Sequence, residues 1–495
     1  MIVDRIDLAP GLSVSRVITG LWQIADMERG GHTLDLDAAA RAMHPYIEAG
    51  FTSFDMADHY GSAELIAGRA RPHEGDAGPG VELLTKWVPP PGPVAAADVR
   101  AAVERALLRL RVPALDLLQF HAWNYADPFW LDALFHLQDL QREGLIRHLG
   151  LTNVDAAHLR LVLASGIPVV SNQVSASLID RRAAGPLAAV CQEFDVSLLA
   201  YGTLCGGWLS DRWLGAEEPD WEGHGTWSQM KYGRFIRAAG GWPALQRVLA
   251  AARVVADRHG VSIANVATRF VMQQPGVAAV IVGARLGERE HIDDNRRLGG
   301  LVLDEDDRLT LEAAIATLTP IPGDCGDEYR TPPFLTASGD LSHHLEAFPA
   351  PYEVRQAPDG TRRCFSGTPW EPMAGYCRAV RRGARVQVSG TTATHGGRLL
   401  GGADPSAQTH AVIDKIAGAL QSLGAALSDV VRTRVYVSNI THWEAVARAH
   451  GERFAAVQPA NTLVEARLVG GEYLVEIEAE AELSEDPQGP GTRDR

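Results

Sequence analysis

Apolar and polar positions follow two different periods between residues 16 and 316. Short apolar runs, each of a length typical of a buried strand, alternate with stretches in which apolar residues recur at helical spacing. The runs lie at residues 17–23, 83–88, 115–120, 147–153, 168–174, 196–202 and 277–283, and the helical stretches include residues 95–110, 155–165, 243–259 and 263–274. Strands that alternate with helices predict a parallel sheet covered by helices.

The number and spacing of these units favour a closed barrel over an open sheet. About eight strand–helix units within about 300 residues are typical of a (β/α)8 TIM barrel. An open Rossmann sheet predicts a GxGxxG motif after its first strand, whereas "VITGLWQ" (17–23) holds one glycine. The sequence therefore predicts an α/β fold with a TIM barrel over residues 1–325.

The pattern changes after the barrel. Residues 326–360 are rich in Pro, Gly and charge, which predicts a loop and a linker. Residues 361–485 have the pattern of a compact α+β domain, and residues 486–495 that of a disordered tail.

Three features define the elements of the second domain. Asp404 followed by Pro405 is typical of a helix start, and "THWE" (441–444) has capping-box spacing before another helix. Residues 385–390 and 430–438 read as strands. In "VEIEAEAE" (475–482) apolar residues alternate with glutamates, which predicts a strand with one buried and one acidic face.

Charge and composition narrow the class of function. A net charge of -15 disfavours nucleic acid and anionic membranes as partners, because both bind positive surfaces. Five scattered cysteines without a CxxC pair indicate reduced thiols. The start of the chain lacks a secretion signal, and no apolar run reaches the about 18 residues of a membrane span. We therefore expect a cytoplasmic protein that acts on a small molecule.

Candidate chemistry gathers where strands end, as catalytic side chains do in barrels. The string "FDMADHYG" (54–61) holds Asp55, Asp58, His59 and Tyr60, a set that suits either a metal site or a proton relay around the tyrosine. Later strands contribute polar groups at their ends, Lys86 in "LLTKW" and His121 in "LLQFHAW". Each of these groups alone is commonly structural. Together, at the ends of successive strands, the four residues Asp55, Tyr60, Lys86 and His121 predict a shared site.

A relay explains these residue types in physical terms. A lysine at the end of an apolar strand is desolvated, and a carboxylate such as Asp55 compensates its charge. A cation beside the Tyr60 phenol lowers the pKa of that phenol. Tyr60 can then donate a proton to a carbonyl oxygen as hydride arrives, with His121 orienting the substrate. The metal alternative requires further His or carboxylate ligands at other strand ends, and neither HxH nor HExxH occurs.

Residues 10 to 320 resemble the aldo-keto reductases, whose Asp-Tyr-Lys-His tetrad falls on Asp55, Tyr60, Lys86 and His121. In this resemblance Asp58 and His59 occupy variable spacer positions, so no metal site is predicted. The resemblance implies a barrel, NADPH (NADP+) as cofactor and a small-molecule carbonyl substrate. The cofactor-binding residues that it implies are Gly20, Trp22, Thr152, Asn153, Gln173, Tyr201, Gly202, Gly283, Arg285, Arg289 and Asn295. Arg285 and Arg289 favour NADPH over NADH, because a 2′-phosphate requires cations. The segment that holds them is about two residues longer than the family pattern.

Residues 365–484 resemble the RidA/YjgF family, which forms trimers with clefts between subunits and includes hydrolases of enamines and imines. The resemblance places Tyr376, Arg378, Asn461 and Glu476 at the cleft. Active members carry an arginine where this chain has Asn461, and an amide cannot form the bidentate pair that a guanidinium makes with a carboxylate. Two readings stay open, a ligand-binding cleft and a domain that only trimerises the chain.

The sequence as a whole predicts an enzyme, an NADPH-dependent oxidoreductase that reduces a carbonyl or imine substrate and assembles as a homotrimer. One alternative is a cofactor-sensing or regulatory protein in which the barrel binds without turnover. A second alternative is a bifunctional enzyme whose C-terminal domain hydrolyses an enamine or imine.

Overall fold

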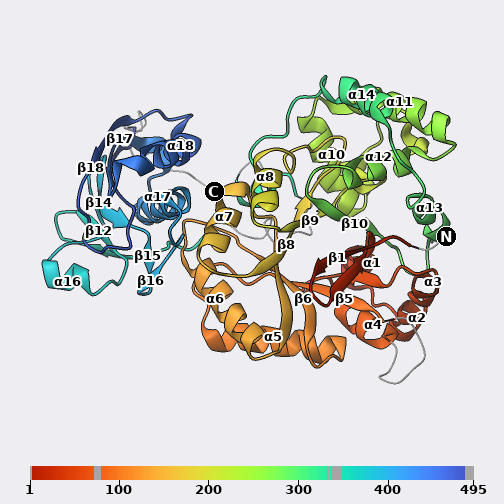
Figure 1. Ribbon diagram of the computed structural model, residues 1–495, viewed down its shortest axis with the longest axis horizontal. Helices are drawn as coiled ribbons and strands as arrows, with labels where there is room; N and C mark the ends of the chain where they lie inside the picture. Colours follow the sequence, from red (N-terminus) through yellow and green to blue (C-terminus); the bar gives the residue numbers. More distant parts are fainter. Residues whose placement is uncertain (1–2, 72–79, 332–333, 337–347, 485–495) are drawn as a thin grey trace.

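The computed structural model describes residues 3–71, 80–331, 334–336 and 348–484. It has two parts, a barrel and a smaller domain that packs against one side of the barrel (Figure 1). The predicted tail, residues 486–495, lies outside the described residues, as does part of the predicted linker.

Eight parallel strands form the closed barrel that the alternating pattern predicts. They are β3 (Val17–Gly20), β4 (Ser53–Asp55), β5 (Glu82–Trp87), β6 (Leu115–His121), β7 (Ile146–Thr152), β8 (Val169–Ser175), β9 (Ser197–Tyr201) and β10 (Val277–Gly283), and β10 pairs with β3 to close the ring. The strands are short apolar runs that are buried almost throughout, as expected for a sheet enclosed by helices.

Helices surround the barrel and follow each strand. They are α1 (Gln23–Met27), α2 (Leu36–Arg41), α3 (His44–Glu48), α4 (Ala63–Ala70), α5 (Ala96–Leu110), α6 (Phe129–Arg142), α7 (Ala156–Ala164), α8 (Pro186–Glu193), α9 (Trp221–His224), α10 (Trp227–Ala238), α11 (Gly241–His259), α12 (Ile263–Met272), α13 (Ile292–Arg297), α14 (Glu305–Ile315) and α15 (Asp327–Arg330). Side-chain caps fix several starts: Asp155 accepts the backbone N–H of His158 at α7, and Ser262 accepts that of Asn265 at α12.

An antiparallel hairpin, β1 (Arg5–Ala9) and β2 (Leu12–Ser15), lies at the end of the barrel where the strands begin. Its buried Leu8, Leu12 and Val14 belong to the same apolar cluster as Ile18 and Leu117 of the barrel strands. This end of the barrel is therefore filled with apolar side chains, which leaves the opposite end for a polar site.

The C-terminal domain is a seven-stranded sheet with two helices on one face. The strand order is β11-β12-β13-β14-β19-β17-β18. The strands are β11 (Glu353–Gln356), β12 (Arg362–Phe365), β13 (Ala379–Arg382), β14 (Arg385–Thr392), β17 (Val430–Val437), β18 (Ala460–Glu465) and β19 (Val475–Glu482), with a small hairpin of β15 (Thr394–His395) and β16 (Arg398–Leu399). The helices are α16 (Trp370–Ala374), α17 (Pro405–Ser422) and α18 (Trp443–Phe454).

The alternating run of β19 has the two faces that the sequence predicts. Val475, Ile477 and Ala479 are buried, and the glutamates between them are half-buried. The helix that Asp404 begins is α17, and Asp404 accepts the backbone N–H of Ala407. Almost every residue of α17 is buried, because the sheet covers one side of this helix and the barrel covers the other.

Two sequence expectations differ from the structure. The sheet of the second domain begins at Glu353, inside the predicted linker 326–360, because β11 and β12 form a hairpin around the turn at Gly360. That linker also holds α15, which packs on the barrel. The predicted capping box at "THWE" is wrong: Asn439 caps a short 3-10 turn at Ile440–His442, and α18 follows it without a side-chain cap.

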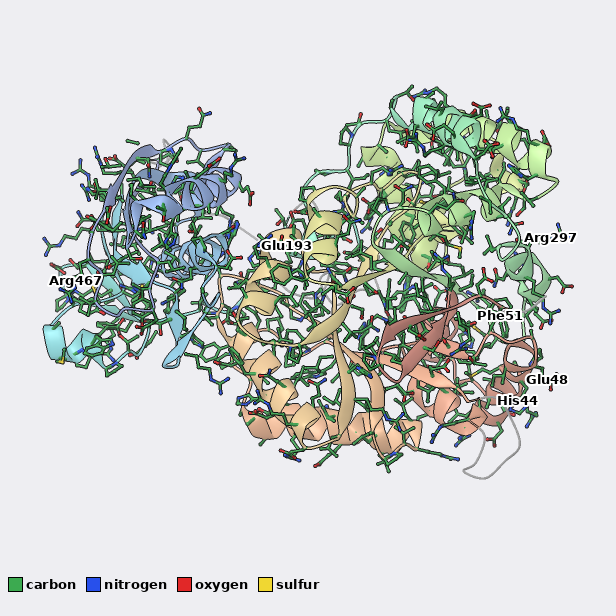
Figure 2. The ribbon with its side chains drawn as sticks, viewed as in Figure 1. His44, Glu48, Phe51, Glu193, Arg297 and Arg467 are labelled. Atoms are coloured by element: carbon green, nitrogen blue, oxygen red, sulfur yellow. The ribbon has the colours of Figure 1, made fainter. Side chains whose placement is uncertain are left out.

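The two domains meet through α7 of the barrel and α17 of the C-terminal domain (Figure 1). Figure 2 labels Glu193 in this region, where Arg160 forms ion pairs with both Glu193 and Asp404. His395 of the small hairpin contacts Asp132 of α6 at 2.7 Å. No helix among the described residues has the length and apolar character of a membrane span.

Candidate active site

A buried ion pair lies where β4 and β5 end. Lys86 Nζ donates to Asp55 Oδ2 at 2.5 Å and to the Met56 carbonyl at 3.0 Å, and both side chains are almost fully buried. Burial lowers the pKa of Lys86, and the charge of Asp55 opposes this effect. The pair is therefore a preorganised cation in a desolvated position, as the residue pattern predicts.

Tyr60 lies directly over this cation. The ammonium nitrogen of Lys86 is 5.0 Å from the centre of the Tyr60 ring. Trp22 packs edge-to-face on that ring at 4.8 Å. The chain reaches this position because the backbone N–H of Asp58 donates to the Lys86 carbonyl, which continues the strand pairing beyond Asp55.

His121 ends the next strand and faces the same end of the barrel. Its imidazole is buried and packs edge-to-face on Trp123 at 4.6 Å and on Tyr329 at 5.6 Å. Burial, followed by the charge of Arg330, holds the pKa of His121 well below 6.5, so the ring is neutral at physiological pH. The Nε2 atom is buried and has no hydrogen-bond partner. A buried nitrogen in this state is available to a reacting oxygen.

Two glutamines extend the ion pair into a network, and one of them is absent from the sequence prediction. Gln173 donates to Asp55 Oδ1 at 2.7 Å and to Gln119 Oε1 at 2.7 Å, and Gln119 donates to Asp55 Oδ1 at 3.1 Å. Gln119 precedes His121 by two residues, so alternation along the strand places both on one face. That alternation was a signal that could have identified Gln119.

The residues expected at the nicotinamide lie together on the next strands. Tyr201 donates its hydroxyl hydrogen to Asn153 Oδ1 at 2.7 Å, and Asn153 adopts a left-handed backbone with φ 59°. Thr152 donates to the Gln173 carbonyl at 3.2 Å. Gly202 follows Tyr201, and a Cβ there would lie 2.2 Å from the Tyr232 hydroxyl, so the site requires glycine.

Three residues from late segments close this end of the barrel and were not predicted. Lys231 on α10 donates to the Tyr329 hydroxyl, and its ammonium lies 4.9 Å from the Tyr201 ring centre. The Tyr329 hydroxyl is 3.3 Å from that of Tyr201. Glu328 accepts from Tyr201 at 3.4 Å. This part of the barrel end is therefore built from α10 and α15, which lie far apart in the sequence.

The remaining predicted cofactor residues lie at the ends of β3 and β10 and in the segment that follows β10. Gly20, expected to line the pocket, and Gly283, expected at the phosphate, are paired neighbours on β3 and β10, and a Cβ on Gly283 would collide with Gln23, whose Oε1 is buried without a partner. Arg285 donates to Asp26 at 2.8 Å and to Glu288 at 2.6 Å.

The remaining two residues of the segment lie further out. Arg289 is exposed, and its backbone N–H donates to the Arg285 carbonyl at 3.1 Å. Asn295 on α13 lines a hollow with Arg16 and Phe51.

Asp58 and His59, the two residues of "FDMADHYG" that most resemble metal ligands, contact each other. His59 Nδ1 is 3.0 Å from Asp58 Oδ1. Within the residues that the structure describes, no group of three or more His, Cys, Asp or Glu side chains is arranged to hold a metal ion. All five cysteines are free thiols, and four of them are buried.

The cleft residues of the C-terminal domain fall into two places. Arg378 is buried and donates to the Gly390 carbonyl at 2.7 Å, while its Nε has no partner. Glu476 lies against Gly390, where an added Cβ would be 2.1 Å from Oε1, and burial raises the pKa of Glu476. Tyr376 lies beside Arg378, with the guanidinium 6.0 Å from the ring centre. Asn461 is on the exposed edge strand β18 and donates to Thr433 at 2.8 Å.

Comparison with known families agrees with this division of the chain. Residues 16–316 match the sequence model described as "Aldo/keto reductase family", and residues 368–483 match the one described as "Endoribonuclease L-PSP". Protein tas of Escherichia coli (strain K12) is 33% identical over 208 residues, which are 38% of this chain and 58% of that protein. The chain therefore spans little more than half of this relative.

Two solved structures cover one part of the chain each. The glycerol dehydrogenase AKR11B4 from Gluconobacter oxydans is 24% identical over 66% of this chain and 98% of its own, with a TM-score of 0.53, which shows the shared barrel fold. Rv2704 from Mycobacterium tuberculosis, a member of the YjgF/YER057c/UK114 family, is 40% identical over 25% of this chain and 99% of its own, with a TM-score of 0.23.

Proposed function

The chain belongs to the aldo/keto reductase family of oxidoreductases, with a RidA-like C-terminal domain, and we propose that its barrel reduces a small-molecule carbonyl compound with NADPH. The observation that carries this proposal is the buried Asp55–Lys86 pair with Tyr60 over its cation. When bound, the reduced nicotinamide supplies the hydride that the carbonyl carbon receives.

Tyr60 is the proton donor in this reaction. As hydride reaches the carbonyl carbon, the electron pair of the C=O bond moves to oxygen, and the phenol proton of Tyr60 neutralises it. The Lys86 ammonium, 5.0 Å from the ring centre, stabilises the phenolate that remains. Asp55 holds that lysine in one place, and Gln119 and Gln173 in turn hold Asp55.

His121 orients the substrate. Its neutral ring carries no charge that would compete with Tyr60, and its partnerless Nε2 can bond the carbonyl oxygen. The edge-to-face contacts with Trp123 and Tyr329 fix the plane of the imidazole. An oriented hydrogen bond to the reacting oxygen lowers the barrier without further reorganisation.

The residues present fit a dinucleotide. Gly20, Gly202 and Gly283 let the side chains of Ile281, Tyr232 and Gln23 pack close to the backbone at this end of the barrel. Gln23 Oε1 is a buried acceptor that lacks a donor. Tyr201 supplies an aromatic face, with Thr152, Asn153 and Gln173 beside it for a carboxamide. Arg285 and Arg289 supply cations for a 2′-phosphate, with Arg285 exchanging a carboxylate partner for the phosphate. Gly283 lies beside the dinucleotide, and Asn295 is proposed to contact its adenine.

Fluorescence titration of the full chain with NADPH and with NADH tests the cofactor. We expect NADPH to bind at least about tenfold more tightly, because each charge-assisted contact to a phosphate contributes about 1.5 kcal/mol or more. Arg285→Met should remove most of this preference, whereas Arg297→Met, an exposed arginine on the following helix, should not. Equal affinity for both cofactors in the parent chain contradicts the assignment of NADPH.

We further propose that the C-terminal domain joins the chain into a homotrimer. Its helices α17 and α18 cover one sheet face, and the other face carries the half-buried Arg434 with Glu478 and Glu480. The edge strand β18 is exposed along its length, and Val431 and Val464 are 48% and 43% exposed. An uncovered sheet face with apolar residues at its edge is typical of a subunit interface. Arg467 lies on the side of this domain away from the barrel in Figure 2.

Light scattering on the full chain measures this assembly. The proposal expects three chains per particle, and Val464→Asp should reduce the particle to one chain. Val469→Asp is the control, because Val469 is exposed in the loop beyond β18. A parent chain that is already a monomer contradicts the proposed trimer.

We propose a ligand-binding cleft without hydrolysis of amino-acid-derived imines for the C-terminal domain. Arg378 and Glu476 supply a cation and a carboxyl beside Gly390, while Asn461 replaces the family arginine with an amide. An enamine-hydrolysis assay of the full chain should show no activity, and Asn461→Arg should create it. Hydrolysis by the parent chain would instead support a bifunctional enzyme.

The free thiols of all five cysteines are consistent with the reducing cytoplasm that we propose as location.

A further inference from the structure

One lysine at the end of the barrel that holds the tetrad has no role in the proposed reaction. Lys231 lies on α10 and is only 7% exposed. Its ammonium donates to the Tyr329 hydroxyl on α15, and it lies 4.5 Å from the centre of that ring and 4.9 Å from the centre of the Tyr201 ring. Removing an ammonium from water costs free energy, which these contacts help to offset. The charge is therefore held in one place beside two tyrosines.

The hydrogen bonds that begin at this ammonium run in one direction. An ammonium can only donate, so the Tyr329 oxygen is an acceptor and the hydrogen of its hydroxyl points elsewhere. The Tyr201 oxygen lies 3.3 Å from that of Tyr329. Burial, followed by the neighbouring Tyr329 and Glu328, raises the pKa of Tyr201 well above 10. Tyr201 therefore keeps its hydrogen at physiological pH and can pass the chain of hydrogen bonds on as a donor.

Two acceptors lie within reach of the Tyr201 hydroxyl hydrogen. Asn153 Oδ1 is at 2.7 Å and Glu328 Oε1 at 3.4 Å, so Asn153 accepts the stronger bond. Glu328 is engaged through its other oxygen, with Arg182 at 3.0 Å and with the backbone N–H of Gly326 at 3.0 Å. The chain of hydrogen bonds has four members in this order: Lys231, Tyr329, Tyr201 and Asn153.

The position of α15 keeps this chain of hydrogen bonds together. Gly326, directly before α15, has φ 89°, and a Cβ there would lie 2.1 Å from the Asn153 carbonyl oxygen. Glycine permits both this backbone conformation and this close approach. Arg182 and Glu328, whose side chains are 7% and 0% exposed, form an ion pair that ties α15 to the segment after β8. These contacts lie within the barrel domain, so the four members are preorganised before a ligand binds.

The orientation of the Asn153 amide follows from this chain. Because Oδ1 accepts from Tyr201, the Nδ2 amino group faces away from Tyr201. Among the described residues Nδ2 makes no hydrogen bond, and it is not one of the fully buried polar atoms without a partner, so it retains accessible surface. Asn153 directly follows β7, at the end of the barrel where His121 also lies. An amide held in this way presents N–H donors, which match a carbonyl oxygen.

From this arrangement we infer that Lys231 and Tyr329 are positioning residues for the cofactor: through Tyr201 they fix the Asn153 amide so that its Nδ2 donates to the carboxamide oxygen of the nicotinamide. The inference rests on the proposed use of NADPH and adds two residues from α10 and α15 to its binding. Without Lys231 the direction of the chain is no longer imposed, and the amide can turn and present Oδ1 in place of Nδ2.

Two ligands separate this role from a general loss of structure. NADPH contains the nicotinamide, whereas adenosine 2′,5′-bisphosphate offers the adenine and the 2′-phosphate without it. In titrations of the full chain, Tyr329→Phe and Lys231→Met should each weaken NADPH about fivefold, the effect of about one hydrogen bond, and should change the affinity for the bisphosphate by less than about twofold. Tyr125→Phe is the control, because the buried Tyr125 hydroxyl makes no hydrogen bond among the described residues, and it should bind both ligands as the parent does.

A double-mutant cycle tests the path through Asn153. Asn153→Gly removes the amide, and glycine adopts the φ of 59° found there without strain. In this background Tyr329→Phe should change NADPH affinity by less than about twofold, because the group that Tyr329 orients is gone.

Three outcomes would overturn the inference and leave the proposed reduction in place. They are a Tyr329→Phe chain that binds NADPH as the parent does, one that loses NADPH and the bisphosphate equally, and one whose loss is the same with and without the Asn153 amide. A parent chain that binds no NADPH contradicts the proposed cofactor itself and the inference with it.

Discussion

The ion cluster that joins the two domains provides a pH-dependent prediction. His158 on α7 contacts Asp155 at 2.7 Å through Nδ1 and Asp414 on α17 at 3.0 Å through Nε2. Burial alone would lower the pKa of His158, but the two carboxylates more than offset it and raise the pKa to about 9. The imidazolium is therefore the charge that binds two buried carboxylates from different domains.

The magnitude follows from the two states of this histidine. A pKa of about 9 in the folded chain and 6.5 in the unfolded chain corresponds to about 3 kcal/mol of stability. Because the folded pKa is the higher one, this contribution is fully present below pH 6.5 and is lost as the pH rises through about 9. Replacing His158 by neutral Gln should therefore cost about 3 kcal/mol more at pH 6 than at pH 9.5.

The assay is urea unfolding of parent and His158→Gln chains at both pH values. The free energies of unfolding of the two chains are compared at each pH, because other groups also titrate in this range. Burial lowers the pKa of Lys415 to about 7, so Lys415 makes the chain more stable as the pH rises, opposite to His158. Both chains contain Lys415, so its effect cancels when they are subtracted. His136→Gln is the control, since no carboxylate pairs with His136 in the described residues. A difference between parent and His158→Gln that stays constant from pH 6 to pH 9.5 would refute this reasoning.

Two further substitutions test the barrel itself. Asp55→Asn leaves the Lys86 ammonium buried without its counter-charge, so the free energy of unfolding should fall by about 3–5 kcal/mol and turnover should be lost. Urea unfolding and a reductase assay measure the two effects, and a fully active and stable variant would show that the pair is dispensable. Gly68→Ala puts a Cβ 2.2 Å from the Arg109 carbonyl oxygen and should destabilise the chain by about 1–3 kcal/mol. The control Gly451→Ala meets no atom within 4 Å and should not destabilise it. Thermal unfolding that ranks the two variants in the opposite order would contradict this account of the packing.

The barrel could be predicted because its strands and helices are each encoded locally. The predicted strand at 277–283 has the bounds of β10, and the predicted helix at 95–110 differs from α5 by one residue. Because catalytic groups in a barrel follow strand ends, the strand prediction also located the Asp55–Lys86 pair before any contact was known.

The parts that were missed depend on contacts between distant segments. Lys231 and Tyr329 meet over Tyr201, but no local period links α10 with α15. His158 and Asp414 are 256 residues apart in the sequence, so neither helix pattern indicates the other. The β11–β12 hairpin differs in kind, because its "PDG" turn at residues 358–360 was a recognisable signal within a segment read as linker.

The central claim is that Tyr60 donates the proton in a reaction that consumes NADPH. Absorbance of the reduced nicotinamide, followed with a panel of aldehydes and ketones, compares the parent chain with Tyr60→Phe and with the control Asp58→Ala/His59→Ala. We predict turnover by the parent and the control, and a loss of at least about 100-fold in Tyr60→Phe with NADPH binding unchanged. Tyr60→Phe that turns over like the parent, or a parent chain that reduces no carbonyl compound, would contradict the proposed mechanism.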